Sequence, residues 1–243
     1  MDSLVFIDTN ILLDFYRVTG REAGLSMLQH IDENHGKIIT TGQVEMEFKK
    51  NRQKVIYDSY EMVKSPNWGP MKPPVFLAES KQAVALAKNQ KEITALTKKL
   101  KKRMGAILRN PSKYDPVYKC TQRLFKSTTP LNLSRDEKIR FKMRRLAFKR
   151  FILGYPPRKD GDTSMGDAIN WEWIVHCANQ ATRNVVIVTR DKDYGISFDK
   201  EPILNDWLSQ EFKERVSRKR KVILSRRLTE GFKEASIKVT KEE

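Results

Sequence analysis

Two apolar segments of the sequence each lead into an aspartate. Asp8 follows the run LVFI at residues 4–7, and Asp191 follows the run NVVIVTR at residues 184–190. Both runs have the length and the β-branched composition of buried strands. In an open α/β sheet, ligand sites form beyond the carboxyl ends of the strands. We therefore expect Asp8 and Asp191 to lie on the same edge of one sheet.

Two further carboxylates are expected near that edge. Asp167 opens an amphipathic helix predicted at 167–179, just before the second of these strands. Glu47 lies one turn into a helix predicted at 43–64, which follows a short strand at 37–40. The four acids therefore have the placement needed to converge on one site.

Converging carboxylates repel one another, and their pKa values rise unless a cation neutralises them. Hard oxygen ligands suit Mg²⁺ or Mn²⁺. Such ions bind phosphodiester oxygens, activate water at neutral pH and stabilise the charge of an in-line displacement. This chemistry needs no Ser, Cys or His nucleophile, and the three histidines of the chain form no suggestive cluster.

The elements that must position these acids alternate between strand and helix at both ends of the chain, which predicts a parallel α/β sheet. A Ser-x-x-Glu capping box at 134–137 is expected to begin a basic helix. Prolines are expected to break the segment 110–132. The remaining expected strand is 222–224, and the remaining expected helices are 11–17, 21–33, 76–108, 134–151, 206–216 and 229–235.

The acids lie in four strings that resemble, in this order, the acidic motifs of PIN-domain ribonucleases. The strings are VFIDTNILLDFY, QVEMEF, GDAINWEW and VVIVTRDKDYG. The resemblance covers roughly 1–64 and 160–235. It implies a three-layer α/β/α sandwich with a parallel central sheet, and Mg²⁺- or Mn²⁺-dependent endonucleolytic cleavage of RNA. It also implies a role as a toxin or in phage defence.

The resemblance carries over residue by residue. Asp8, Asp167 and Asp191 match acids that hold the metal and serve in catalysis. The second acid is either Glu45 or Glu47, and we prefer Glu47 because an aromatic residue follows it. Beside the acids, the positions expected to orient ligands or contact the phosphate are Thr9, Asn10 and Thr189. Asp162 is a further acid, ranked below Asp167.

The formal net charge of +17 comes from one part of the chain. Residues 88–160 hold 22 Lys and Arg but only 5 Asp and Glu. We expect a single PIN-like domain over 1–243, formed by about 1–65 and 160–235, with a basic helical insertion at about 76–155. Phosphate binding is favoured for two clusters, which are Lys98, Lys99, Lys101, Lys102 and Arg103, and Arg144, Arg145, Lys149 and Arg150.

Other interpretations remain open at this point. Asp8 also suits a helix N-cap, Asp191 a turn, and Asp167 the first turn of a helix. A non-catalytic nucleic-acid-binding protein would keep the fold without cleavage. A haloacid-dehalogenase-like phosphatase also places an Asp after its first strand, but it usually carries a second Asp where this chain has Asn10.

The sequence contains no apolar run of about 18 residues and no basic start typical of a signal peptide. Its two cysteines, Cys120 and Cys177, have no metal-ligand spacing, which favours a reducing, cytoplasmic setting. The expected partner is nucleic acid, RNA above all, with no membrane. A homodimer and an inhibitory or defence-system partner are expected from the resemblance.

These expectations generate a first prediction. Reversing the charges of the cluster at 98–103, with Glu at its five basic positions, should weaken RNA binding and flatten its salt dependence, because phosphate contacts release counterions. Metal affinity should stay unchanged. Titrations of labelled RNA and of Mn²⁺ check both statements. A loss of metal affinity with intact RNA binding would contradict this division of roles.

Overall fold

A computed structural model of the chain describes residues 3–17, 24–64, 66–158 and 164–239. The chain divides into two compact units. The first comprises Met1–Phe15, Thr19–Arg52 and Pro116–Glu243, and the second comprises Tyr16–Val18 and Gln53–Asp115. All four expected acids belong to the first unit.

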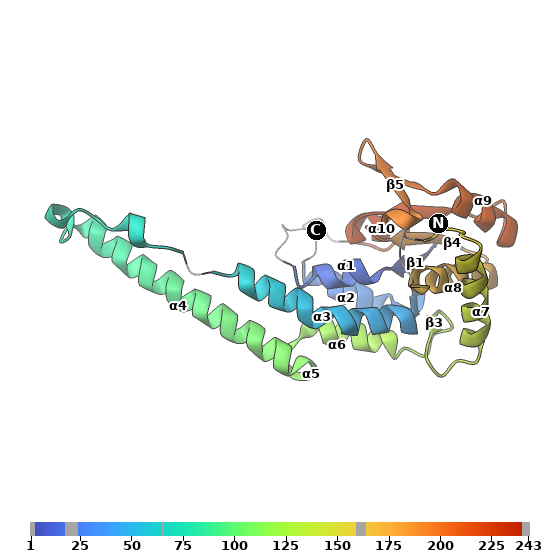
Figure 1. Ribbon diagram of the computed structural model, residues 1–243, viewed down its shortest axis with the longest axis horizontal. Coiled ribbons are helices and arrows are strands. Elements are labelled where there is room, and N and C mark those ends of the chain that lie inside the picture. Colours follow the sequence, from blue (N-terminus) through green and yellow to red (C-terminus); the bar gives the residue numbers. More distant parts are fainter. Residues whose placement is uncertain (1–2, 18–23, 65, 159–163, 240–243) are drawn as a thin grey trace. The chain divides into compact units, whose positions relative to one another are not determined.

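A parallel sheet of five strands forms the centre of the first unit, in the order β3-β2-β1-β4-β7. Figure 1 labels β1, β3 and β4 of this sheet. Its strands are β1 (Ser3–Ile7), β2 (Ile38–Thr41), β3 (Asn132–Leu133), β4 (Asn184–Val188) and β7 (Val222–Ser225). The expected parallel α/β sheet is confirmed. Strands β5 (Gly195–Phe198) and β6 (Glu201–Leu204) form a separate antiparallel hairpin that the sequence did not predict.

Strands β1 and β4 lie at the middle of the sheet, and every residue of both is buried. Continuous apolar runs of this kind are typical of parallel strands that are covered on both faces. Their register pairs Ile7 with Val188, so both strands end at the same level. The strand order reverses between them, which makes this edge the switch point where open α/β sheets bind ligands.

Helices flank the sheet and complete a three-layer α/β/α sandwich. Helix α8 packs against β2 and β4, whereas α10 packs against β1, β4 and β7. The helices that lie wholly in the first unit are α1 (Thr9–Asp14), α2 (Ser26–Glu33), η1 (His35–Lys37), α6 (Pro116–Phe125), α7 (Ile139–Ile152), α8 (Gly166–Ala181), η4 (Lys192–Tyr194), α9 (Asp206–Arg215) and α10 (Leu228–Glu234).

The second unit is largely helical. Helix α3 (Gly42–Met62) contributes its residues after Arg52, and η2 (Gly69–Met71), η3 (Val75–Leu77), α4 (Lys81–Arg109) and α5 (Pro111–Tyr114) follow. Ser80 caps α4 by accepting a hydrogen bond from the Ala83 N–H. None of the described helices is long and apolar enough to cross a membrane.

The basic segment expected as one insertion at about 76–155 is divided by the structure. Residues 116–155 belong to the first unit, where α6 packs against α2 and β3 extends the sheet beside β2. Pro111 and Pro116 do not break helices but begin α5 and α6, because the first helical residue needs no N–H partner. The packing of α6 against α2 and the pairing of β3 with β2 therefore place the end of this segment in the first unit.

The expected capping box at 134–137 is wrong. Helix α7 begins at Ile139, and its N-cap Lys138 makes no side-chain capping bond. Residues 134–137 instead close a turn, in which the Glu137 N–H donates to the Ser134 carbonyl. Ser134 follows β3 directly, so the chain must first turn before a helix can start.

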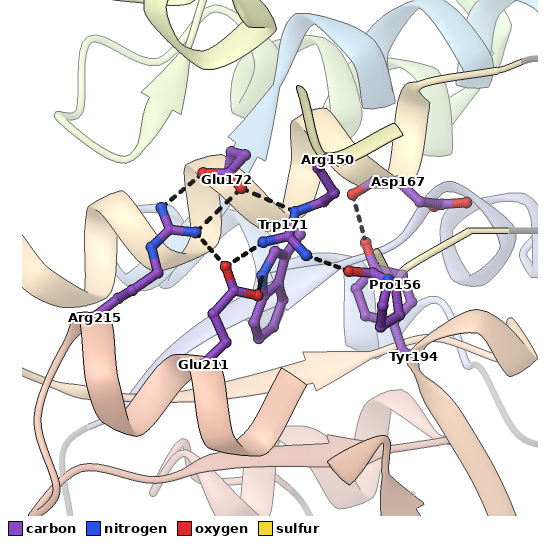
Figure 2. Close-up of polar contacts among 8 residues, drawn as sticks. All are labelled: Arg150, Pro156, Asp167, Trp171, Glu172, Tyr194, Glu211 and Arg215. Carbon is purple, nitrogen blue, oxygen red and sulfur yellow. Dashed lines mark hydrogen bonds and ion pairs between the residues drawn. The ribbon is translucent and has the colours of Figure 1, made fainter. Parts of the chain in front are cut away.

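One arginine of the expected phosphate-binding clusters is committed to the core. Arg150 on α7 is only 4% exposed, and its Nε donates to Glu172 on α8 at 2.9 Å. It also donates to Glu211 on α9 and to the Pro156 carbonyl (Figure 2). Arg215 pairs with the same two glutamates. Arg150 is therefore not available for phosphate, and its expected role is wrong.

This buried cluster generates a stability prediction. Arg150→Met should lower the free energy of unfolding by about 3–5 kcal/mol, because it leaves buried carboxylates with one cation fewer. Urea denaturation measures the change. Lys149→Met, at the neighbouring exposed position of α7, serves as the control and should stay within about 0.5 kcal/mol of the parent. Equal midpoints for the two variants would contradict the prediction.

Candidate active site

Asp8 lies directly after β1 and serves as the N-cap of α1. Its Oδ1 accepts a hydrogen bond from the Thr9 N–H at 2.6 Å, and its Oδ2 accepts one from Asn10 Nδ2 at 2.7 Å. The Thr189 hydroxyl also donates to Oδ2. The carboxylate is 3% exposed. The short polar string after β1 therefore fixes the orientation of Asp8.

Asp191 lies in the loop after β4. Its N–H donates to the Thr189 hydroxyl at 3.0 Å, so one threonine connects Asp191 to Asp8. Arg226, which follows β7, donates to the carbonyl oxygens of Thr189, Asp191 and Gly195 at 2.7–3.1 Å. This guanidinium holds the loop that carries Asp191.

Glu47 reaches the same edge from α3. Its Oε2 accepts from the Thr9 hydroxyl at 3.1 Å, and its Oε1 accepts from Gln43 Nε2 at 2.7 Å. A Cβ at Gly166 would lie 2.5 Å from Glu47 Oε1, so a larger residue there would displace the Glu47 carboxylate from its present position. Glu45 instead pairs with Lys49 at 2.6 Å. Between the two candidates, the geometry favours Glu47.

Asp167 lies in the first turn of α8, next to Gly166. Its carbonyl oxygen accepts a hydrogen bond from the hydroxyl of the fully buried Tyr194 at 3.4 Å (Figure 2). Burial raises the pKa of Tyr194 well above its ordinary value, and the charges of Asp167, Asp8, Asp191 and Glu47 raise it further. All four expected acids are therefore close enough to Tyr194 for their charges to act on it.

The crowding of negative charge also affects Asp8. Burial raises the pKa of Asp8 from 3.8 to about 7, and the carboxylates of Asp191 and Glu47 add to this rise. The hydrogen bonds from Thr189 and from the Thr9 N–H act in the opposite direction. At neutral pH, Asp8 is thus poised between its protonated and ionised forms.

The donor set fits a divalent cation. In the described part of the chain, no group of three or more His, Cys, Asp or Glu side chains is already arranged to enclose an ion. The carboxylates of Asp8 and Glu47 are instead directed towards hydroxyl and amide groups of the chain. A cation would remove the repulsion that raises the pKa of Asp8, and hard oxygen donors are the ligands that Mg²⁺ and Mn²⁺ prefer.

The residues expected to contact substrate fall into two groups. Thr9 and Thr189 are buried, and both, like the partly buried Asn10, hydrogen-bond to the acids. Their geometry suits orienting carboxylates. Arg144 and Arg145 are exposed on α7, in the same unit as the acids. Lys98, Lys99, Lys101, Lys102 and Arg103 lie on α4 in the second unit.

Three residues at this edge were missed from the sequence. They are Gln43, which orients Glu47, Tyr194, which lies among the four acids, and Arg226, which holds the Asp191 loop. Only Tyr194 carried a signal, since it lies within the last acidic string. Asp162 lies outside the described residues.

The fold and this edge together define a class of protein. It is an α/β protein with a parallel sheet, and Asp8 and Asp191 follow the two strands between which the strand order reverses. A family model described as PIN domain matches residues 5–194, so the chain belongs to the PIN-domain family. Members of this family are typically nucleases that depend on Mg²⁺ or Mn²⁺. Neither a search of curated proteins nor a search of solved structures found a significant match.

The raised pKa of Asp8 gives a prediction for metal binding. In the metal-free protein, a carboxyl group whose folded pKa is above its ordinary value stabilises the fold at low pH and loses that contribution as pH rises through about 7. A cation must displace the Asp8 proton, so apparent Mn²⁺ affinity should fall by up to about tenfold per pH unit below 7 and level off above it. Calorimetric titration from pH 6 to 8 checks this.

The matched control is Glu45→Gln, which removes a nearby carboxylate that pairs with Lys49. It should reproduce the pH dependence of the parent. A Mn²⁺ affinity that stays constant between pH 6 and 7 would show that no group at the site exchanges a proton for the ion.

Proposed function

We propose that the chain is an endoribonuclease that hydrolyses phosphodiester bonds with the help of Mg²⁺ or Mn²⁺. The observation that carries this proposal is that the charges of Asp8, Glu47, Asp167 and Asp191 all act on the buried Tyr194, near the switch point of the sheet. Membership of a family of metal-dependent nucleases supports it.

The four carboxylates would hold the cation. When bound, it would supply Lewis-acid stabilisation of the charge that develops on the phosphate. Thr9, Asn10 and Thr189 would keep Asp8 and Glu47 in position through the hydrogen bonds described above. Near neutral pH, Asp8 would be partly protonated because its pKa is about 7, and the cation would displace that proton.

RNA is the proposed substrate because it is a polyanion, and basic side chains that could bind its phosphates lie on more than one element of the chain. Exposed arginines on α7 belong to the same unit as the acids, and the α4 cluster adds further positive charge in the second unit. Phosphate neutralisation of this kind is independent of sequence. The proposal extends to a role as a toxin or defence effector, in which a partner protein would restrain the nuclease.

The test compares two glutamates on the same helix. Glu47→Gln should lower Mn²⁺-dependent cleavage of labelled RNA by roughly 100-fold or more, since it removes a charge at the site. Glu45→Gln should cleave like the parent, because Glu45 pairs with Lys49 instead. Labelled total RNA, tRNA and single-stranded DNA, each with Mn²⁺ or with EDTA, identify the substrate.

Asp191→Asn provides a second inactive variant and suits this purpose better than Asp8→Asn. Every hydrogen bond described for the Asp8 side chain is donated to its carboxylate, so an amide at position 8 would place N–H groups against other donors. Induced expression of the parent should arrest bacterial growth, whereas Asp191→Asn should not. Equal cleavage by the parent and by Glu47→Gln would overturn the proposed site.

A further inference from the structure

A hollow of about 240 Å³ lies beside the start of α3, in the first unit. Three arginines line it, Arg135 from the turn after β3 and Arg140 and Arg144 from α7, together with Gln43 of α3. No acidic side chain among the described residues lines it. We call this hollow the arginine pocket.

The three arginines have no carboxylate partner in the part of the chain that the structure describes. None of them forms an ion pair with a carboxylate among residues 3–17, 24–64, 66–158 and 164–239. The Nε of Arg140 is buried and has no hydrogen-bond partner in that part of the chain. A buried donor without an acceptor costs about 1–3 kcal/mol. Both features are explained if an external anion enters the pocket.

The position of Arg140 strengthens this interpretation. It lies in the first turn of α7, where the helix dipole disfavours a cation and where no acidic residue belongs to the same turn. The arginine pocket is also lined by Gly42 and Gln43, the first residues of the 21-residue helix α3. Two helices thus begin at the same hollow, and the partial positive charge of their first turns adds to that of the arginines.

The arginine pocket is connected to the acids by shared residues. Gln43, which lines it, donates to Glu47 Oε1 at 2.7 Å. A neighbouring hollow of about 280 Å³ shares Gln43 and Arg144 with it and extends to Gly166, the residue before Asp167. An extended anionic chain that occupies both hollows would therefore pass Glu47 and the start of α8.

The size of the arginine pocket restricts the ligand. Its volume lies below the roughly 300–1,000 Å³ of pockets that enclose drug-sized molecules. Guanidinium groups bind phosphate oxygens through paired hydrogen bonds. A single phosphate group matches these donors.

We propose that the arginine pocket binds one phosphate group of the nucleic-acid strand, next to the phosphate that lies over the four carboxylates. This inference deepens the proposed nuclease function and rests on it for the identity of the strand. Contacts to phosphate position a strand without reading its sequence. The arginine pocket therefore sets the register of the strand at the acidic edge.

The experiment measures binding in the absence of cleavage. Fluorescence anisotropy with a labelled single-stranded RNA, in EDTA and at several salt concentrations, gives the dissociation constant and its salt dependence. Arg140→Gln combined with Arg144→Gln should weaken binding about tenfold and reduce the salt slope by about 0.7, the value for one phosphate contact on a single strand. Arg135→Gln, on a different element, provides an independent variant.

The matched control is Lys142→Gln. Lys142 is exposed on α7 between Arg140 and Arg144 but does not line the arginine pocket. It should leave affinity and salt slope within twofold of the parent. If the double variant and Arg135→Gln both bind RNA as Lys142→Gln does, the proposal is overturned.

Two RNA probes distinguish the source of the phosphate. The same oligonucleotide is used with a 5′-phosphate and with a 5′-hydroxyl. Equal losses of affinity in the double variant identify an internal phosphodiester, and a loss confined to the 5′-phosphorylated probe identifies a strand end. Either result supports a phosphate site.

Cleavage assays separate this proposal from the nuclease function. A parent that binds RNA through the arginines but does not cleave it in Mn²⁺ would overturn the nuclease and leave the phosphate site in place. Conversely, a parent that cleaves RNA while the arginine variants retain full affinity would overturn the phosphate site alone.

Discussion

Repulsion between like charges is the constraint on which this structure depends. Asp8 is buried at the end of a central strand, with the carboxylates of Asp191 and Glu47 close enough to raise its pKa. Within the described residues, the groups that donate hydrogen bonds to the Asp8 carboxylate are hydroxyl, amide and backbone donors, and none of them is a cation. Such an arrangement is costly for stability alone and useful where an external cation is to be bound.

The rest of the first unit keeps these carboxylates close together despite their mutual repulsion. The register of β1 and β4 brings Asp8 and Thr189 to the same level, and the Asp8 N–H donates to the Val188 carbonyl. On the helical side, Arg150 and Arg215 bind both Glu172 and Glu211 and so join α7, α8 and α9 (Figure 2). Arginines have two roles in this unit. The buried ones connect helices through ion pairs, and the exposed ones remain available to an anion.

Much of the fold could be predicted because its central strands are apolar and its long helices are periodic. The four acids were found because each lies at the end of a strand or near the start of a helix. The two-residue strand β3 and the hairpin of β5 and β6 are too short for a clear period. Helix α6 was hidden by the proline that begins it.

The contacts that complete the site could not be predicted, because they join residues far apart in the sequence. Arg226 reaches the carbonyl of Asp191 from 35 positions away. Nothing in a run of basic residues shows that Arg150 is buried while Lys149 beside it is exposed. Tertiary packing decides both cases.

The hydrogen bonds from Arg226 to the loop that carries Asp191 have a consequence for the order in which the site is completed during synthesis. The family match ends at residue 194, yet the loop that carries Asp191 is held by an arginine 32 positions further along. During translation, the strands that carry Asp8 and Asp191 leave the ribosome before Arg226 and β7 do. Until Arg226 has been made, the nascent chain therefore contains both acids without the hydrogen bonds that hold the Asp191 loop. Synthesis from the amino end therefore completes the acidic edge late, after most of the body has been made.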